Sequence, residues 1–333
     1  MEHRQSERDA NFAPEIPGVS VVLPILNEER FLKDSITAIL AQKYPGELEV
    51  ILALGPSRDK TDVIAQELAQ HDSRVVLVTN PSGRTAAGLN RAIAQARYSI
   101  ICRIDGHAEI SDTYIAKAVA TMRQTGAVNV GGVMAAVGQN RFEKAVATAM
   151  RSPLGVGGAR FHVGGKPGPA DTVYLGVFDR AALQAAGGYD ERFTRAQDWE
   201  LNFRLRQAGG IIWFDPELVV TYRPRPNLKA LAKQYFEYGR WRRAVMRSHK
   251  GTVNYRYLAP PVAVLACVLS LIAGLAITPY FYIPALAYCL GNVLGSFAIG
   301  KSWSEKLLLP AVLATMHFSW GIGFLTSPKN LVE

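Results

Sequence analysis

Apolar runs of strand length alternate with segments of helical spacing through the first part of the chain. The predicted strands are 19–24, 48–54, 75–78 and 98–104, and the predicted helices are 31–41, 61–69 and 86–96. Strands separated by helices of about 10 residues indicate a mostly parallel sheet covered on both faces. Ligands of such sheets bind beyond the carboxyl ends of the strands. The pattern therefore predicts one crevice shared by the turns at 24–28, 55–59 and 105–107.

A different hydrophobic pattern occupies the C-terminal quarter. Residues 257–300 form a run of 44 positions without Asp, Glu, Lys or Arg, about twice the roughly 20 residues that cross a bilayer once. Thr278-Pro279 divides this run into predicted spans at 258–277 and 281–300, and a third uncharged run predicts a span at 307–326. The alternative is a buried helical hairpin in a soluble protein.

The positive charge of the chain is concentrated just before the first predicted span. The formal net charge is +9, and ten basic residues against Glu237 between Tyr222 and Arg256 leave the rest of the chain balanced. Segments rich in Lys and Arg that flank a membrane span stay on its cytoplasmic side. We therefore expect a multi-pass protein of the cytoplasmic membrane with its α/β domain in the cytoplasm. Three spans would then place Glu333 on the opposite side, whereas two cytoplasmic termini would mean that one run, most readily the third, is re-entrant or interfacial. No nucleic-acid partner is expected, because the cluster has no recognisable scaffold for reading bases.

The domain organisation follows from these patterns. We expect a polar tail at 1–18 without a signal peptide, an α/β domain at 19–225, a basic amphipathic segment at 226–256 and the membrane region at 257–328. The basic segment is predicted to lie on anionic lipid, the alternative being an ordinary surface helix of the domain. The three cysteines are too widely spaced for a disulfide framework or a zinc site. They are Cys102, Cys267 and Cys289.

Five segments of the α/β domain carry candidate chemistry. They read VVLPILNEE at 21–29, NPSGR followed by AGLN at 80–90, RIDGH at 103–107, GGYDE at 187–191 and QDWEL at 197–201. In this order they resemble motifs of the family-2 glycosyltransferases. The resemblance implies the GT-A nucleotide-sugar-binding fold, and the Asp-x-His form of the third segment resembles the succinoglycan-type membrane-associated β-glucosyltransferase branch.

The resemblance also implies a donor site and a metal site. Asp105 and His107 occupy the family's Asp-x-Asp position, which implies Mn²⁺ or Mg²⁺ offsetting the charge of the leaving diphosphate; His107 also has a purely structural alternative. Residues that the resemblance and the predicted crevice assign to nucleotide-sugar binding are Pro24, Asn27, Glu28, Asp59, Arg84, Asp105, Arg240 and Trp241. The last two come from 234–241, which resembles the Gln-x-x-Arg-Trp motif with a longer spacing; they could equally anchor the basic helix.

Asp198 matches the family's catalytic base. An inverting transfer needs one base to take the proton of the acceptor hydroxyl. Asp198 begins a segment of helical spacing, whose dipole favours the ionised form. The alternatives are that Asp198 only caps this helix, or that Glu200 or Gln197 is the functional residue.

One stretch departs from the family pattern. The paired acids that usually end the second strand are Leu54 and Gly55 here. Base recognition is then left to Glu28 or backbone groups, and a UDP-hexose donor is favoured only weakly. A glycine-rich segment at 155–171 is expected to be a mobile loop over the donor diphosphate, or simply a flexible surface loop.

The leading functional hypothesis is transfer of a hexosyl group from a nucleotide sugar to a polyprenyl-linked saccharide at the cytoplasmic membrane face. Such a reaction serves polysaccharide or cell-envelope biosynthesis. A polyprenyl-phosphate monosaccharide synthase is the alternative enzyme. A non-catalytic membrane scaffold with a degenerate sugar-nucleotide domain is the alternative from another class.

Overall fold

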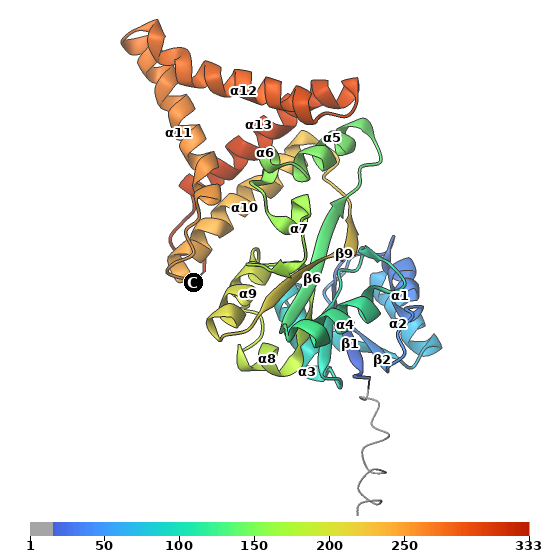
Figure 1. Cartoon of the computed structure of the whole chain (residues 1–333). Helices are drawn as coiled ribbons and strands as arrows, with labels where there is room; N and C mark the ends of the chain where they lie inside the picture. The colour runs from blue at the N-terminus through green and yellow to red at the C-terminus, as the bar shows by residue number, and fades with distance from the viewer. Residues whose placement is uncertain (1–15, 333) are drawn as a thin grey trace, which may run out of the picture.

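The computed structural model describes residues 16–332, so most of the predicted polar tail at 1–18 lies outside the described part. Figure 1 shows an α/β domain next to a group of long helices formed by the C-terminal third of the chain. The division expected near residue 225 falls between the last strand of the domain and the first of these helices.

Within residues 16–332, nine strands form one mixed sheet in the order β3-β2-β1-β4-β8-β6-β9-β5, with β7 paired to β9. The first four strands are parallel, as predicted, and β8 is antiparallel to both of its neighbours. The strands are β1 (Val19–Ile25), β2 (Leu48–Leu54), β3 (Val75–Thr79), β4 (Ile100–Arg103), β5 (Glu109–Ile110), β6 (Asn129–Ala136), β7 (Gly168–Pro169), β8 (Tyr174–Asp179) and β9 (Ile212–Tyr222).

Helices cover both faces of the sheet. Residues alternate along β1, with Val21 and Leu23 in the core on one face and Val22 in the core on the other. Helices α1 and α4 lie on the first face, and α3, α8 and α9 on the second. The helices of the domain are α1 (Leu32–Leu40), α2 (Thr61–His71), α3 (Thr85–Gln95), α4 (Tyr114–Thr125), α5 (Arg141–Met150), α6 (Pro153–Val156), α7 (Arg160–Val163), α8 (Arg180–Ala185) and α9 (Gln197–Gln207).

The C-terminal third consists of long helices. They are α10 (Leu228–Ser248), α11 (Tyr255–Ala276), the short 3₁₀ helix η2 (Pro279–Tyr282), α12 (Ile283–Ile299) and α13 (Trp303–Leu325). Three segments, Tyr255–Ala276, Pro279–Ile299 and Trp303–Leu325, are long and apolar enough to cross a membrane, in agreement with the three predicted runs. Most side chains of α11 and α12 are exposed and apolar, which suits contact with lipid.

Helix α13 differs from α11 and α12 because it packs along the α/β domain. Leu309, Val312 and Met316 share a core with Met134 and Ala136 of β6. Its other side lies against α10 (Figure 1). The third predicted apolar run, which forms α13, is therefore covered by protein over much of its length.

Two glycines allow α10 and α13 to approach closely. A Cβ atom at Gly239 would lie 2.0 Å from the carbonyl oxygen of Trp320, and one at Gly323 would lie 2.1 Å from the carbonyl oxygen of Phe236. Because these neighbours are backbone atoms, any side chain at either position would force the helices apart. Residues Leu228–Ser248 of the basic segment thus form one helix, which packs closely on α13, while its predicted contact with anionic lipid stays a prediction.

The chain returns to the α/β domain after α13. Arg247 of α10 donates to the carbonyl oxygens of Ser327 (2.9 Å) and Pro328 (2.6 Å). Leu331 and Val332 pack against a cluster that contains Phe193, Trp199 and Trp241. Glu333 itself lies outside the described residues, and this contact favours a C-terminus on the same side of a membrane as the domain over the expected opposite side.

Candidate active site

The centre of the site is a buried arginine at the end of β4. Arg103 has a side chain only 5% exposed and donates to Asp105 at 3.1 Å, while its other terminal nitrogen pairs with Asp198. It therefore connects the carboxylate of the predicted metal motif with the predicted base. Arg103 was not among the predicted site residues, although a basic residue at the end of a buried strand, next to the motif, was a usable signal.

Asp198 lies in the first turn of α9 with part of its side chain open to solvent. Ala196, at φ 59°, is the cap residue of this helix, and no side-chain cap hydrogen bond is present there, so capping does not explain Asp198. Burial raises the pKa of Asp198 above the usual aspartate value, and the opposing effect of Arg103 is smaller. A carboxylate with a raised pKa is a better proton acceptor than an ordinary aspartate.

The alternatives to Asp198 have structural partners instead. Glu200 is buried and pairs with Arg204 at 2.7 Å and with His249 at 2.9 Å. Gln197 is also buried. Of the three polar residues at the start of α9, Asp198 alone combines partial exposure with a contact to the β4 end.

His107 lies against Glu28, and this pair tests the metal prediction. The Nδ1 atom of His107 lies 2.8 Å from Oε1 of Glu28, which leaves Nε2 available as a ligand in the carboxylate–histidine arrangement common at metal sites. The Glu28 contact raises the pKa of His107. Among residues 16–332 no group of three or more His, Cys, Asp or Glu side chains is arranged to hold a metal. A divalent ion that takes few protein ligands and completes its shell with phosphate oxygens and water fits Asp105 and His107.

Asn27 and Asp59 connect two loops at the carboxyl ends of β1 and β2. Oδ1 of Asn27 accepts from the backbone N–H of Arg58 at 2.8 Å. Asp59 accepts from the backbone N–H groups of Glu29 at 3.2 Å and Thr61 at 3.1 Å. These side chains fix the loop that carries Glu28, and their polar atoms are largely used within it.

Arg84 and Pro24 lie at the junction of the first, second and fourth motif segments. Arg84 donates to the carbonyl oxygen of Glu191 at 3.1 Å. The site of a Cβ at Gly88, on α3, lies 3.3 Å from Cβ of Pro24. Segments far apart in the sequence thus meet at one edge of the sheet, as the parallel arrangement predicted.

The missing acids after β2 have a packing explanation. A Cβ atom at Gly55 would lie 3.1 Å from Leu26 and 3.2 Å from Cα of Gly83. Gly83 has a φ of 62° and lies in the loop between β3 and α3, two residues before the helix. A carboxylate at position 55 would displace this loop, so base recognition must use other groups.

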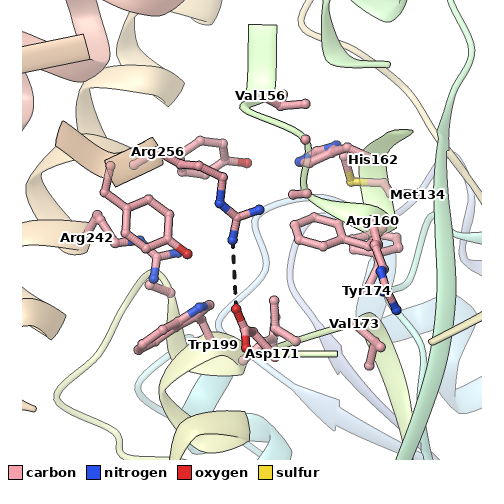
Figure 2. Close-up of a pocket in the computed structure, with 18 of the residues that line it drawn as sticks. Met134, Val156, Arg160, His162, Asp171, Val173, Tyr174, Trp199, Arg242 and Arg256 are labelled. Atoms are coloured by element: carbon pink, nitrogen blue, oxygen red, sulfur yellow. Dashed lines mark ion pairs between the residues drawn. The ribbon is translucent and has the colours of Figure 1, made fainter. Parts of the chain in front are cut away.

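Asp198 lines a cavity of about 770 Å³, part of whose wall is drawn in Figure 2. The cavity lies between the α/β domain and helices α10, α11 and α13, and its lining includes Trp241, Pro260 and Trp320. Trp241 thus lines the same cavity as Asp198. Arg240 does not line the cavity and pairs with Glu237 on its own helix at 3.0 Å.

The glycine-rich segment 155–171 contains regular secondary structure and is not a simple loop. It contains part of α6, all of α7, and β7, and it contributes Arg160, His162 and Asp171 to the cavity wall (Figure 2). It therefore borders the cavity beyond Asp198, whereas it was expected over the donor diphosphate. Burial lowers the pKa of His162 to about 4, so this side chain is neutral near pH 7.

Comparison with known proteins places this geometry in a family. A model described as glycosyl transferase family 2 matches residues 20–187. The succinoglycan biosynthesis protein ExoA of Rhizobium meliloti (strain 1021) is 33% identical over 310 residues, which cover 91% of this chain and 93% of that protein.

More distant relatives extend the comparison. A dolichyl N-acetyl-alpha-D-glucosaminyl phosphate 3-beta-D-2,3-diacetamido-2,3-dideoxy-beta-D-glucuronosyltransferase of Methanococcus voltae is 25% identical over 95% of this chain and 97% of its own length. The mannosyltransferase PcManGT from Pyrobaculum calidifontis, solved with GDP-Man and Mn²⁺, has the same fold at a TM-score of 0.59 and 18% identity, over 97% of this chain and 92% of that one. The succession of motifs, the mixed GT-A sheet and the match over half of its length show that this chain belongs to glycosyl transferase family 2.

Proposed function

We propose that this protein transfers a hexosyl group, with inversion, from a nucleotide sugar to a saccharide carried by a polyprenyl lipid. The observation that carries the proposal is the position of Asp198. It lies between the donor-side residues at the end of β4 and a cavity whose far wall is formed by apolar helices. A base in this place can serve a hydroxyl group that arrives from the membrane side.

Asp198 would accept the proton of the acceptor hydroxyl as its oxygen attacks the anomeric carbon. Its raised pKa favours this step, and Arg103 holds the carboxylate in place. Donor binding is assigned to the edge of the sheet formed by Pro24, Glu28 and Asp105. A divalent ion bound by Asp105 and His107 would offset the charge that develops on the departing diphosphate.

The names of two relatives support a lipid-linked saccharide as the acceptor. The name of the Methanococcus voltae enzyme describes transfer to position 3 of a sugar on a dolichyl phosphate, which is a lipid-linked saccharide. That of the Rhizobium meliloti protein refers to succinoglycan, a polysaccharide product. A UDP donor gains no support, because the solved mannosyltransferase holds GDP-Man, so the nucleobase has to be found by experiment.

The decisive experiment is a transfer assay with the purified full chain in lipid nanodiscs. A panel of UDP-, GDP- and dTDP-sugars is offered with Mn²⁺, Mg²⁺ or EDTA, and with either a polyprenyl-diphosphate saccharide or polyprenyl phosphate as acceptor. We expect metal-dependent transfer to the saccharide, with the anomeric configuration of the donor inverted. Transfer to polyprenyl phosphate alone would establish the synthase alternative, and failure to bind or turn over any donor would establish the scaffold alternative.

A further inference from the structure

The cavity beyond Asp198 has an excess of positive charge. Five arginines line it, against the two carboxylates of Asp171 and Asp198, so the wall carries three more positive charges than negative ones. The arginines are Arg160, Arg195, Arg206, Arg242 and Arg256. Because Asp198 is itself paired with Arg103, Asp171 is the acid left to balance the group.

Arg242 is the most unusual of these arginines. Its guanidinium carbon lies 4.6 Å from the ring centre of Trp199 and 4.2 Å from that of Tyr257. One of its terminal nitrogens is buried and has no hydrogen-bond partner, and within residues 16–332 no carboxylate lies within 4.0 Å of it. Burial lowers the pKa of Arg242. A half-buried guanidinium with one buried, unpartnered nitrogen and no counterion is costly unless an anion completes the site.

Arg256 lies on the same side of the cavity. Its guanidinium carbon is 5.8 Å from the ring centre of Tyr257, so Arg242 and Arg256 share one aromatic neighbour. Its contact with Asp171, drawn in Figure 2, is long at 3.9 Å, and Asp171 is also shared with Arg206 at 3.7 Å. Both long contacts leave the guanidinium groups free to bind an incoming anion with better geometry.

The position of this pair separates it from the donor site. Pro24, Glu28 and Asp105 do not line the cavity, which begins at Asp198 and extends toward Pro260 and Trp320 of the apolar helices. An anion here therefore lies on the acceptor side of the base. A ligand that fills the whole cavity must combine a charged group with an apolar chain.

We infer that Arg242 and Arg256 bind the diphosphate that joins the acceptor saccharide to its polyprenyl chain, and that the chain is directed toward the residues of α11 and α13 that line the cavity. Two guanidinium groups suit the several oxygens of a diphosphate. The apolar helices that follow suit the lipid. This inference deepens the proposed function and rests on it, since it names the group of the acceptor that the enzyme recognises.

The test measures binding without transfer, so that it does not depend on knowing the donor. Farnesyl diphosphate is titrated into the nanodisc-embedded full chain, with farnesol and inorganic pyrophosphate as comparison ligands. We expect farnesyl diphosphate to bind more tightly than either. The variants R242Q and R256Q should each weaken its binding about 10- to 100-fold, the range for lost hydrogen bonds to charged groups.

The control is R243Q on the same helix. Arg243 lies over Phe324, with its guanidinium carbon 5.0 Å from the ring centre, and does not line the cavity, so the same loss of charge should leave binding unchanged. R256Q and the charge-preserving R242K cover the case in which R242Q fails to fold, which its thermal transition would reveal. R242K should still lose affinity, since Lys lacks the planar fork.

Three results would overturn the inference. They are unchanged affinity in folded R242K and R256Q, equal binding of pyrophosphate and farnesyl diphosphate, and displacement of farnesyl diphosphate by a nucleotide sugar that the protein binds. The last would assign the arginines to the donor. Failure of every donor in the transfer assay would instead refute the proposed function, while arginine-dependent binding of farnesyl diphosphate could still be observed.

Discussion

Arg103 and Asp198 define the chemistry of the site at the scale of single residues. The guanidinium of Arg103 is buried between two carboxylates, and this arrangement holds Asp198 without using it as a helix cap. Glu200, two positions away, is buried in a separate network with Arg204 and His249. Asp198 and Glu200 therefore have different roles, although they lie in one helix, because their surroundings differ.

We predict that D198N lowers the rate of transfer by at least about two orders of magnitude, within the range typical of positioned general bases. Asn has nearly the same size but cannot accept the proton. Donor binding, measured by titration with the nucleotide sugar, should change little. The parent protein is the reference, and a D198N rate within a few-fold of it would refute the assignment.

The pH dependence gives an independent check of the same prediction. A base must be deprotonated to act, so transfer should fall as the pH decreases through the pKa of Asp198. Because burial raises this pKa, the fall should be centred above the usual aspartate value of about 3.9. The residual transfer rate of D198N should not show this fall at low pH. A fall that persists in D198N would report the titration of another group.

The contact of α10 with α13 is the main feature at the scale of elements. The two helices cross at Gly239 and Gly323, where each glycine faces the backbone of the other helix. The same pair of helices supplies Trp241, Arg242 and Trp320 to the cavity. A change in their separation should therefore affect stability and acceptor binding together.

We predict that G239A destabilises the protein, because its Cβ would lie 2.0 Å from a backbone oxygen. Overpacking of this kind costs about 1–3 kcal/mol, more than the roughly 1 kcal/mol that Ala gains over Gly in a helix. The matched control is G291A on α12, where nothing lies within 4 Å of the added atom. The thermal midpoint in nanodiscs should fall for G239A and stay level or rise for G291A; equal midpoints would contradict the close crossing.

The whole molecule combines a family-2 catalytic domain with a membrane region that begins and ends against it. Helices α11 and α12 expose apolar side chains, while α13 runs back along α10 and the domain (Figure 1). This arrangement supports association with a membrane through α11 and α12. We propose that α13 lies at the membrane surface, with one of its sides covered by the α/β domain.

Reporter fusions test this topology. We expect reporters at the two ends of the full chain to lie on the same side of the membrane, which the basic cluster at 223–256 predicts to be the cytoplasmic side. The physical reason is the packing of Leu331 and Val332 on the cluster around Trp199 and Trp241. A C-terminal reporter on the opposite side would show that this contact does not exist in the membrane.

The sequence by itself determined the first four strands, the three helices between them, their parallel order, the three apolar runs and the residues of the motifs. Strand and helix periodicity is a local property, and the parallel pattern already placed Glu28, Asp59 and Asp105 at one edge of the sheet. Only the tertiary structure revealed Arg103 between Asp105 and Asp198, because that contact joins residues 95 positions apart. The same holds for Arg242 and Arg256, which the sequence presented merely as part of a basic cluster. Hydropathy also could not distinguish α13 from a lipid-facing span, because protein cores and lipid chains are covered by the same apolar side chains.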